Sequence, residues 1–173
     1  MEEKPEPIRC WNSKVPHEWI DYNNHLTEGY YGVVFGYAGD KLLEELGFGT
    51  AYLNEQGTFY TVESRIRFLR EIHVGAEIYT HGWVLGCDEK RLHWLQELYV
   101  EGNSEPAATQ EALLLHVIQG QEGESPKVGP MKDPILSIAQ EFMDKHLAFS
   151  FPSFVLNLFA FARTISNSLL NGK

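Results

Sequence analysis

The amino-acid sequence predicts an α+β fold in which an antiparallel sheet curls around one long helix. Three observations lead to this prediction: a single helical pattern over residues 27–46, a strand-like segment before it, and four strand-like segments after it. Short, turn-like segments separate these four strands, and turn-length connections are typical of antiparallel sheets. The chain of 173 residues is long enough for one ordinary domain with its own hydrophobic core.

The elements before the sheet follow from local sequence signals. Residues 8–15 predict a short strand, and residues 21–25 carry the Asp and Asn side chains that form turns and cap helices. The helical pattern then runs over residues 27–46 and ends at Gly47.

One face of the predicted helix carries four glycines at spacings of three, four and three residues: Gly29, Gly32, Gly36 and Gly39. Each glycine inside a helix costs about 0.8–1 kcal/mol relative to alanine. We therefore expect this face to lie very close to another backbone, either in the chain's own sheet or in a second subunit.

The strand prediction is clearest over residues 58–69, where apolar and polar side chains alternate. The alternation predicts a half-buried strand whose buried face consists of Tyr60, Val62, Ile66 and Phe68. Three further strands are predicted over residues 76–86, 90–101 and 107–119.

The remainder of the chain differs in composition. Residues 119–134 predict a polar linker rich in Gly and Pro, and helices are predicted over residues 134–147 and 151–170. Polar residues interrupt the last helix, so we expect it to dock on the core or a partner subunit and not to span a membrane. We accordingly divide the chain into a domain over residues 1–133 and a helical C-terminal extension over residues 134–173.

The composition excludes several classes of function. The chain has 24 acidic against 14 basic residues, and its formal net charge of −10 makes nucleic acid an improbable partner. Cys10 and Cys87 are too few for a disulfide framework, and neither has the spacing of a zinc site, so no metal is expected. The acidic, proline-containing start has no apolar signal segment, and we expect a cytoplasmic protein.

Chemically reactive side chains concentrate over residues 21–28, where the predicted helix begins. A helix N-terminus presents unpaired N–H groups and partial positive charge, which suit a carbonyl oxygen that becomes an anion. Asp21, just upstream, can act as a nucleophile or a general base toward such a carbonyl. Asn24 and His25 can donate to the oxyanion, although helix capping is the alternative interpretation of these residues.

A second group of interest is basic. Arg65, Arg67 and Arg70 lie within six residues, and Lys90 and Arg91 begin a neighbouring predicted strand. Because guanidinium groups bind phosphate through paired hydrogen bonds, this group suggests a phosphate-bearing ligand. Ion pairing with nearby glutamates is the alternative.

Residues 16–31, PHEWIDYNNHLTEGYY, resemble the active-site segment of acyl-CoA thioesterases with the hotdog fold, in the 4-hydroxybenzoyl-CoA thioesterase-like superfamily. Residues 61–71 and 107–117 resemble the next and the last strand of that family, and the betainyl-CoA thioesterase group is the subgroup they resemble. The resemblance implies a hotdog domain that hydrolyses a small acyl-CoA, with coenzyme A as part of the substrate and no separate cofactor. It also implies a homodimer or a dimer of dimers, with active sites between subunits.

The resemblance further implies roles for individual residues. Asp21 would be the catalytic carboxylate, with Asn23 and His25 at the other polar positions of the motif, and Glu28 and Glu63 as rival carboxylates. Asn24 stands where many relatives have Gly. The phosphates of coenzyme A would meet Arg65, Arg67 and Arg70. A trimethylammonium acyl group would be held by cation–π contacts, and the expected acyl-binding residues are Trp19, Tyr22, Tyr30, Tyr31, Tyr60 and Glu63.

Two other functions remain open on the sequence alone. A hydratase or dehydratase of acyl thioesters would need a His and an acid facing the substrate within the helix, and this helix has no His after His25. A non-catalytic acyl-CoA binding module is the other alternative.

Overall fold

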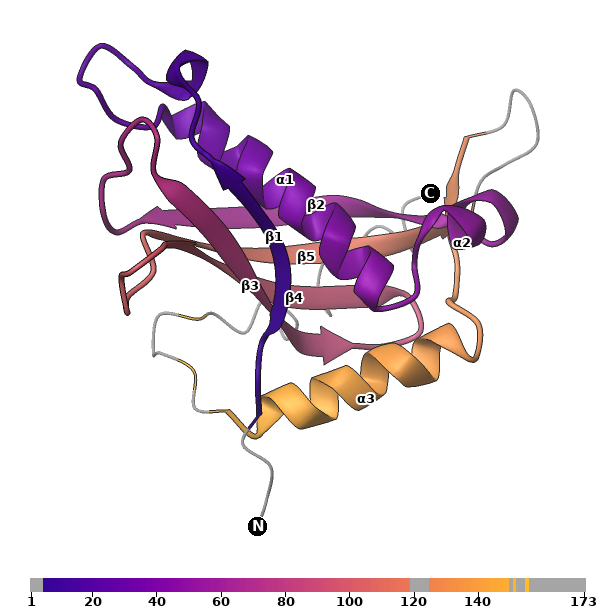
Figure 1. The fold of residues 1–173 in the computed structure, drawn as a ribbon. Helices are drawn as coiled ribbons and strands as arrows, with labels where there is room; N and C mark the ends of the chain where they lie inside the picture. The colour runs from indigo at the N-terminus through magenta and orange to yellow at the C-terminus, as the bar shows by residue number, and fades with distance from the viewer. Residues whose placement is uncertain (1–4, 119–124, 150, 152–154, 156–173) are drawn as a thin grey trace.

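The computed structural model describes residues 5–118, 125–149, 151 and 155, and it confirms the predicted α+β architecture (Figure 1). An antiparallel sheet with the strand order β1-β3-β4-β5-β2 curls around helix α1, and the short strand β6 pairs with β5. The strands are β1 (Ile8–Lys14), β2 (Thr58–Phe68), β3 (Glu77–Cys87), β4 (Arg91–Val100), β5 (Ala108–Ile118) and β6 (Lys127–Val128). The helices are η1 (His17–Trp19), α1 (Glu28–Glu45), α2 (Thr50–Glu55) and α3 (Ile135–Leu147).

Helix α1 packs one face on the sheet. Its buried side chains recur at helical spacing and include Tyr31, Val34, Phe35, Ala38 and Leu42. The side-chain amide of Gln96 on β4 donates to the carbonyl of Phe35 at 3.1 Å, which ties the helix backbone to the sheet.

The glycine stripe of α1 only partly meets the sheet of its own chain. A Cβ atom at Gly39 would lie 3.2 Å from the ring of Trp94, so this glycine permits close packing on β4. The other three glycines, Gly29, Gly32 and Gly36, are exposed and have nothing within 4 Å of such a Cβ atom. The expectation of close packing on the chain's own sheet is therefore right at Gly39 and wrong for the other three.

Strand β2 contains a β-bulge that the alternation of its sequence did not reveal. Its register against β5 shifts at Val62, which is an extra residue without a partner in the pairing. Because the bulge reverses the direction of the side chains that follow, Phe59 before it and Ile66 after it both pack on the core. The predicted buried face is therefore right at Ile66 and wrong at Tyr60 and Val62, which are 47% and 49% exposed. Phe68 is 50% exposed as well, although its ring contacts Tyr31 of α1.

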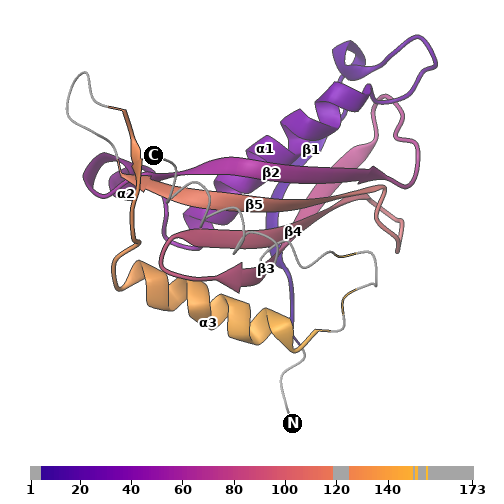
Figure 2. The ribbon, with the colours of Figure 1, turned by 180° about the vertical axis from the view of Figure 1, so that it is seen from behind.

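Strand β2 is also an edge of the sheet. It pairs with β5 on one side, and among the described residues no strand pairs with its other side (Figure 2). An edge strand of eleven residues with exposed apolar side chains is a template for pairing with another chain.

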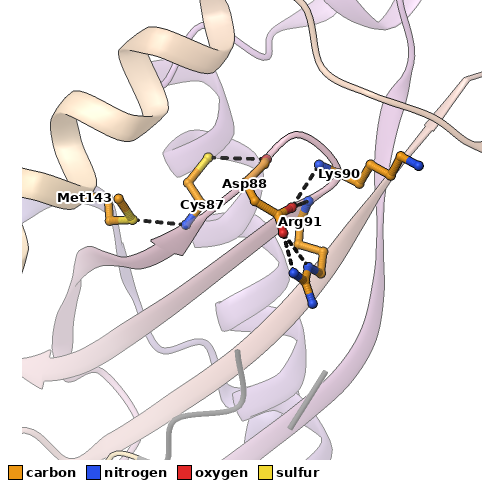
Figure 3. A network of polar contacts seen from close by, with 5 residues as sticks. All are labelled: Cys87, Asp88, Lys90, Arg91 and Met143. Atoms are coloured by element: carbon orange, nitrogen blue, oxygen red, sulfur yellow. Dashed lines mark hydrogen bonds and ion pairs between the residues drawn. The ribbon is translucent and has the colours of Figure 1, made fainter. Parts of the chain in front are cut away.

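Helix α3, predicted over residues 134–147, protects the opposite edge. Strand β1 pairs with β3 only as far as Gly82, and α3 lies along the part of β3 beyond that point. The N–H of Val84 donates to Nδ1 of His146 at 2.8 Å. The N–H of Cys87 donates to the sulfur of Met143 at 3.2 Å (Figure 3). Side chains of α3 therefore satisfy backbone donors that a further strand would otherwise bind.

The turn between β3 and β4 is closed by Asp88. Its carboxylate accepts hydrogen bonds from the backbone N–H groups of Lys90 and Arg91, both at 2.9 Å, and pairs with the Arg91 guanidinium (Figure 3). Arg91 lies opposite Leu115 of β5, at the end of the sheet far from Arg70. The expectation that Lys90 and Arg91 extend the basic group of β2 is therefore wrong.

The predicted linker over residues 119–134 is partly structured. Strand β6 pairs with β5, and the buried Met131 joins the core between β6 and α3. The predicted helix over residues 151–170 lies outside the described residues, apart from Phe151 and Val155. No helix in the described part of the chain combines the length and the apolar run needed to cross a membrane.

Candidate active site

The turn before α1 is held in shape by Asp21. Its Oδ1 atom accepts hydrogen bonds from the N–H groups of Asn23, at 2.8 Å, and His25, at 3.2 Å. The backbone of Asn24 closes the turn with a φ angle of 65°, in the left-handed region that Asn tolerates better than most residues. The local sequence thus positions the carboxylate through the backbone that follows it.

Backbone hydrogen bonds dock this turn on the rest of the molecule. The N–H of Leu26 donates to the carbonyl of Ile72 at 2.8 Å, and the N–H of Thr27 donates to the carbonyl of Trp19 at 2.9 Å. Leu26 and Ile72 are both buried, so the turn and the segment after β2 are fixed relative to each other.

A pocket of about 390 Å³ opens between this turn, the start of α1 and the end of β2. Asp21 and His25 line it from the turn, and Tyr31 lines it from α1. A second hollow of about 620 Å³ continues along the exposed glycines of α1 and shares Glu28 and Phe68 with the first. Together they form a groove from Asp21 along the open side of α1 and β2.

The apolar wall of the pocket contains two aromatic rings, those of Tyr31 and Phe68, beside Leu26 and Leu69. The two rings meet edge to face, with centroids 5.0 Å apart, and the Tyr31 hydroxyl points to the carbonyl of Arg70 at 3.5 Å. Burial raises the pKa of Tyr31, and the charges of Glu71 and Asp21 add to this effect, so the phenol stays neutral at working pH.

The polar wall carries more acidic than basic groups. Asp21, Glu28 and Glu71 line the pocket, with Arg70 as the guanidinium among its lining residues. Nε2 of His25 lies 3.2 Å from the Glu71 carboxylate, which orients the imidazole toward the pocket rim. Such a pocket favours a cationic group beside its carboxylates.

The start of α1 offers backbone donors to the groove. The N-cap residue, Thr27, makes no side-chain capping bond, and the N–H groups of Glu28 and Gly29 have no acceptor among the described residues. Both residues line the second hollow. These N–H groups, with the partial positive charge of the helix terminus, can bind a carbonyl oxygen that becomes negative.

The structure brings only some of the predicted site residues together. Asp21, His25, Tyr31, Arg70 and the rival carboxylate Glu28 line the pocket. The remaining predicted residues do not line either hollow: Trp19, Tyr22, Asn23, Tyr30, Tyr60, Glu63, Arg65 and Arg67.

The predicted site residues that lie outside the pocket differ in their contacts and in their exposure. Trp19 and Tyr30 stack on each other with ring centroids 5.2 Å apart, and Tyr22 is 94% exposed. The side chain of Asn23 is exposed, and its contribution to the turn comes from its backbone N–H.

The arginines predicted for phosphate divide between two sides of the sheet. Ile66 and Phe68 point toward α1, so the alternating neighbours Arg65, Arg67 and also Glu63 point to the opposite face. Arg70, beyond the end of β2, is exposed at the pocket. Of these three arginines, Arg70 is the one that lies on the pocket side of the sheet, so it is the one that can contact a phosphate at this pocket.

Four residues that line the pocket are not among the site residues predicted from the sequence, namely Leu26, Phe68, Leu69 and Glu71, and His73 lies beside them. The alternation of β2 predicts Phe68 as a core residue of its strand. Glu71 and His73 flank the buried Ile72, so alternation around this residue could have placed them together on the outer side. Nothing in the sequence indicates the Leu26–Ile72 hydrogen bond that brings them to His25.

Comparison with known proteins agrees with this geometry. Residues 15–159 match the thioesterase-like superfamily. The chain is 32% identical over 146 residues to a betainyl-CoA thioesterase of Pseudomonas aeruginosa, and this match covers 84% of this chain and 89% of that protein. It is 39% identical over 111 residues to an L-carnitine dehydrogenase/betainyl-CoA thioesterase of Rhizobium meliloti; this match spans 64% of the chain and 22% of that longer protein.

The fold is also that of solved proteins. A protein of Staphylococcus aureus whose structure was solved in complex with CoA superposes with a TM-score of 0.72 and 19% identity, over 83% of this chain and 89% of that one. The hotdog arrangement predicted from the resemblance is therefore confirmed.

Proposed function

Because this chain belongs to the thioesterase-like superfamily, we propose that it is an acyl-CoA thioesterase that hydrolyses a small acyl-CoA to the free acid and CoA. The observation that carries this proposal is the position of Asp21, whose carboxylate lines the pocket directly before the N-terminus of α1. A carboxylate and a set of unpaired N–H groups are the two parts that thioester hydrolysis requires.

The Asp21 carboxylate acts on the thioester in one of two ways. As a general base, it removes a proton from water while the water oxygen attacks the thioester carbon. As a nucleophile, its own oxygen attacks that carbon, and water then hydrolyses the resulting anhydride. In both cases the C–S bond breaks, the sulfur of CoA leaves with the electron pair, and CoA is released as the thiol after protonation. Because Oδ1 already accepts two backbone hydrogen bonds, Oδ2 is the oxygen suited to this role.

The N–H groups of Glu28 and Gly29 stabilise the negative charge that develops on the thioester oxygen. These donors are fixed by the helix and need no rearrangement when the charge appears. The partial positive charge at the helix terminus adds to their effect, and the open groove beside Gly29 and Gly32 leaves space for the thioester.

The acyl group that best suits the pocket carries a positive charge, and we infer betainyl-CoA as the substrate. The pocket has three carboxylates against one guanidinium, and Tyr31 and Phe68 present aromatic rings to it. A trimethylammonium group gains about 0.5–2 kcal/mol from such a ring contact. The betainyl-CoA thioesterase of Pseudomonas aeruginosa supports the same assignment. The L-carnitine dehydrogenase/betainyl-CoA thioesterase of Rhizobium meliloti supports a role in carnitine metabolism.

Arg70 is our proposed contact for the phosphates of CoA, since it is exposed at the mouth of the pocket. The Staphylococcus aureus relative solved with CoA supports a CoA ligand for this fold. We also propose a homodimer that forms through the edge strand β2, where Tyr60 and Val62 are exposed, and where Ser64 and Ile66 line one hollow with the open glycines Gly29 and Gly32 of α1. The two free cysteines, Cys10 and Cys87, suit a reducing compartment, and we expect the enzyme in the cytoplasm.

An assay of thiol release tests both the proposed reaction and the proposed substrate. The panel contains betainyl-CoA and its neutral isostere 3,3-dimethylbutyryl-CoA, in which carbon replaces the quaternary nitrogen. We expect a preference for betainyl-CoA of about tenfold in kcat/KM, the value of one ring contact of moderate strength. The variant Phe68→Leu reduces this preference, whereas Tyr37→Leu, at a half-exposed tyrosine of α1 outside the pocket, leaves it unchanged.

The outcomes test the identity of the substrate separately from the type of reaction. Faster hydrolysis of the neutral isostere would contradict the betainyl assignment while leaving the thioesterase intact. No thiol release from any acyl-CoA, with CoA-dependent thermal stabilisation, would contradict the thioesterase itself and favour a binding module.

A further inference from the structure

Three side chains with metal-ligating atoms meet at the rim of the pocket: His25, Glu71 and His73. Each offers one nitrogen or oxygen ligand, and these atoms all lie within 4.8 Å of one another. Nε2 of His25 is 3.2 Å from the Glu71 carboxylate, and the rings of His25 and His73 have centroids 5.0 Å apart. The cluster joins the turn before α1 to the segment that follows β2.

The backbone holds the two halves of this cluster in place. The N–H of Leu26, the residue after His25, donates to the carbonyl of Ile72, the residue between Glu71 and His73, at 2.8 Å. Because Ile72 is buried, its two neighbours point outward on the same side. The side chains can therefore approach one ion without any change in the fold.

His73 also has the tautomer that a metal ligand needs. Its Nδ1 atom lies 3.2 Å from the carbonyl oxygen of Asn24, and a carbonyl oxygen only accepts hydrogen bonds. Nδ1 is therefore the nitrogen that carries a proton, and Nε2 is the nitrogen that can bind a metal. A histidine that donates its second N–H to a backbone carbonyl is the usual arrangement at protein metal sites.

We propose that His25, Glu71 and His73 form a binding site for a divalent transition-metal ion, with Zn²⁺ as the ion that fits best. Two imidazoles and one carboxylate are a known ligand set for Zn²⁺, whereas Mg²⁺ and Ca²⁺ prefer oxygen ligands alone. Zinc bonds of about 2.0–2.2 Å place tetrahedral ligand atoms about 3.4 Å apart. His25 and Glu71 already have this spacing, and the ligand atom of His73, which lies within 4.8 Å of the other two, has to come closer. The exposed side chains of Glu71 and His73 can make this movement by rotation.

The ion would inhibit the enzyme, and this part of the proposal rests on the proposed function. Zn²⁺ would bind Nε2 of His25 and the Glu71 carboxylate in place of their direct contact. This contact lies at a pocket that Asp21 also lines. The ion would place a double positive charge where we propose that a cationic acyl group binds. Binding of the metal and of the substrate should therefore exclude each other.

Metal titration of the full chain, free of any affinity tag, tests the site. Zn²⁺ binding is measured by calorimetry, and Co²⁺ binding by its visible absorption, which reports the number and type of ligands. We expect one ion per chain, no competition from Mg²⁺, and an affinity that falls about tenfold or more in His73→Gln. The control His17→Gln removes an exposed histidine outside the cluster and should bind as the wild type does.

Activity measurements complete the test, because His73 has no part in the proposed chemistry. Without metal, His73→Gln should hydrolyse acyl-CoA at the wild-type rate, and Zn²⁺ should inhibit the wild type much more strongly than the variant. An absence of metal binding in the wild type, or equal affinity in His73→Gln, would overturn the site. Tight Zn²⁺ binding without inhibition would overturn the proposed inhibition by the ion. Metal binding by a protein without any thioesterase activity would count against the proposed function and not against the metal site.

Discussion

Asp21 and His25 are joined by two hydrogen bonds across the turn that precedes α1. The N–H of His25 donates to the Asp21 side chain at 3.2 Å, and the N–H of Asp21 donates to the carbonyl of His25 at 2.9 Å. The carboxylate is thus fixed a few residues before the helix terminus whose N–H groups we propose as the oxyanion site. The proposed catalytic carboxylate and oxyanion donors thus come from one short segment, residues 21–29, and the end of β2 with the residues after it supplies the other side of the pocket.

The turn itself provides the first prediction, because Asn24 has a φ angle of 65°. Glycine adopts this conformation freely, so Asn24→Gly should change the free energy of unfolding by less than about 0.5 kcal/mol and keep turnover. A β-branched side chain is strained there, so Asn24→Val should destabilise the fold by about 1–2 kcal/mol. Urea denaturation measures both values, and equal stability of the two variants would argue against the left-handed turn.

The contact between α3 and the edge of β3 predicts a dependence of stability on pH. Burial, as the largest cause, lowers the pKa of His146 from its ordinary value of 6.5, and its Nδ1 atom accepts the N–H of Val84. The unfolded chain therefore binds a proton at a higher pH than the folded chain does. The free energy of unfolding should be constant well above pH 6.5 and should decrease as the pH falls below this value.

Urea denaturation at about pH 7.5 and about pH 5.5 measures this decrease. In His146→Gln the amide oxygen can accept the Val84 N–H without titrating, so the decrease should be smaller than in the wild type. It should not vanish, because burial also lowers the pKa values of His81 and His116. The exposed His17→Gln is the control, and an unaltered decrease in His146→Gln would show that His146 is not a source of the pH dependence.

The proposed dimer through β2 predicts the effect of a charge at Val62. This residue is 49% exposed in the bulge, so Val62→Lys should not disturb the fold of the single chain. A lysine on an edge strand opposes pairing with a second copy. Light scattering after size-exclusion chromatography should give a dimer for the wild type and for Val128→Lys on β6, and a monomer for Val62→Lys. A wild-type monomer, or a Val62→Lys dimer, would be inconsistent with this interface.

The sequence predicts the local features of this protein well, because they depend on neighbouring residues. The helix expected over residues 27–46 is found over Glu28–Glu45, and the turn that begins at Asp21 lies at the pocket. The helix follows from helical periodicity and the glycine stop at Gly47, and the turn follows from the hydrogen bonds of the Asp21 side chain; all of these act within a few residues.

The errors concern relationships between distant segments. The bulge at Val62 depends on the register between β2 and β5, so the alternation of β2 alone places Tyr60 on the buried face. Closeness in sequence likewise suggests one ligand for Arg65, Arg67 and Arg70, although only Arg70 of these three lies at the pocket. The Leu26–Ile72 hydrogen bond likewise brings Glu71 and His73 to His25 without any motif in the sequence. Only the three-dimensional arrangement reveals such pairs.

The central claim, that Asp21 is the catalytic carboxylate, is tested most directly by the turnover of Asp21→Asn with betainyl-CoA. The Asn side chain keeps an oxygen that can accept the N–H groups of Asn23 and His25, so the melting temperature should match that of the wild type. It cannot remove a proton or attack the thioester, and kcat should fall about 100-fold or more. The rival variants Glu28→Gln and Glu63→Gln should lose much less. Wild-type turnover by a folded Asp21→Asn, with a large loss in one of the rivals, would contradict the account.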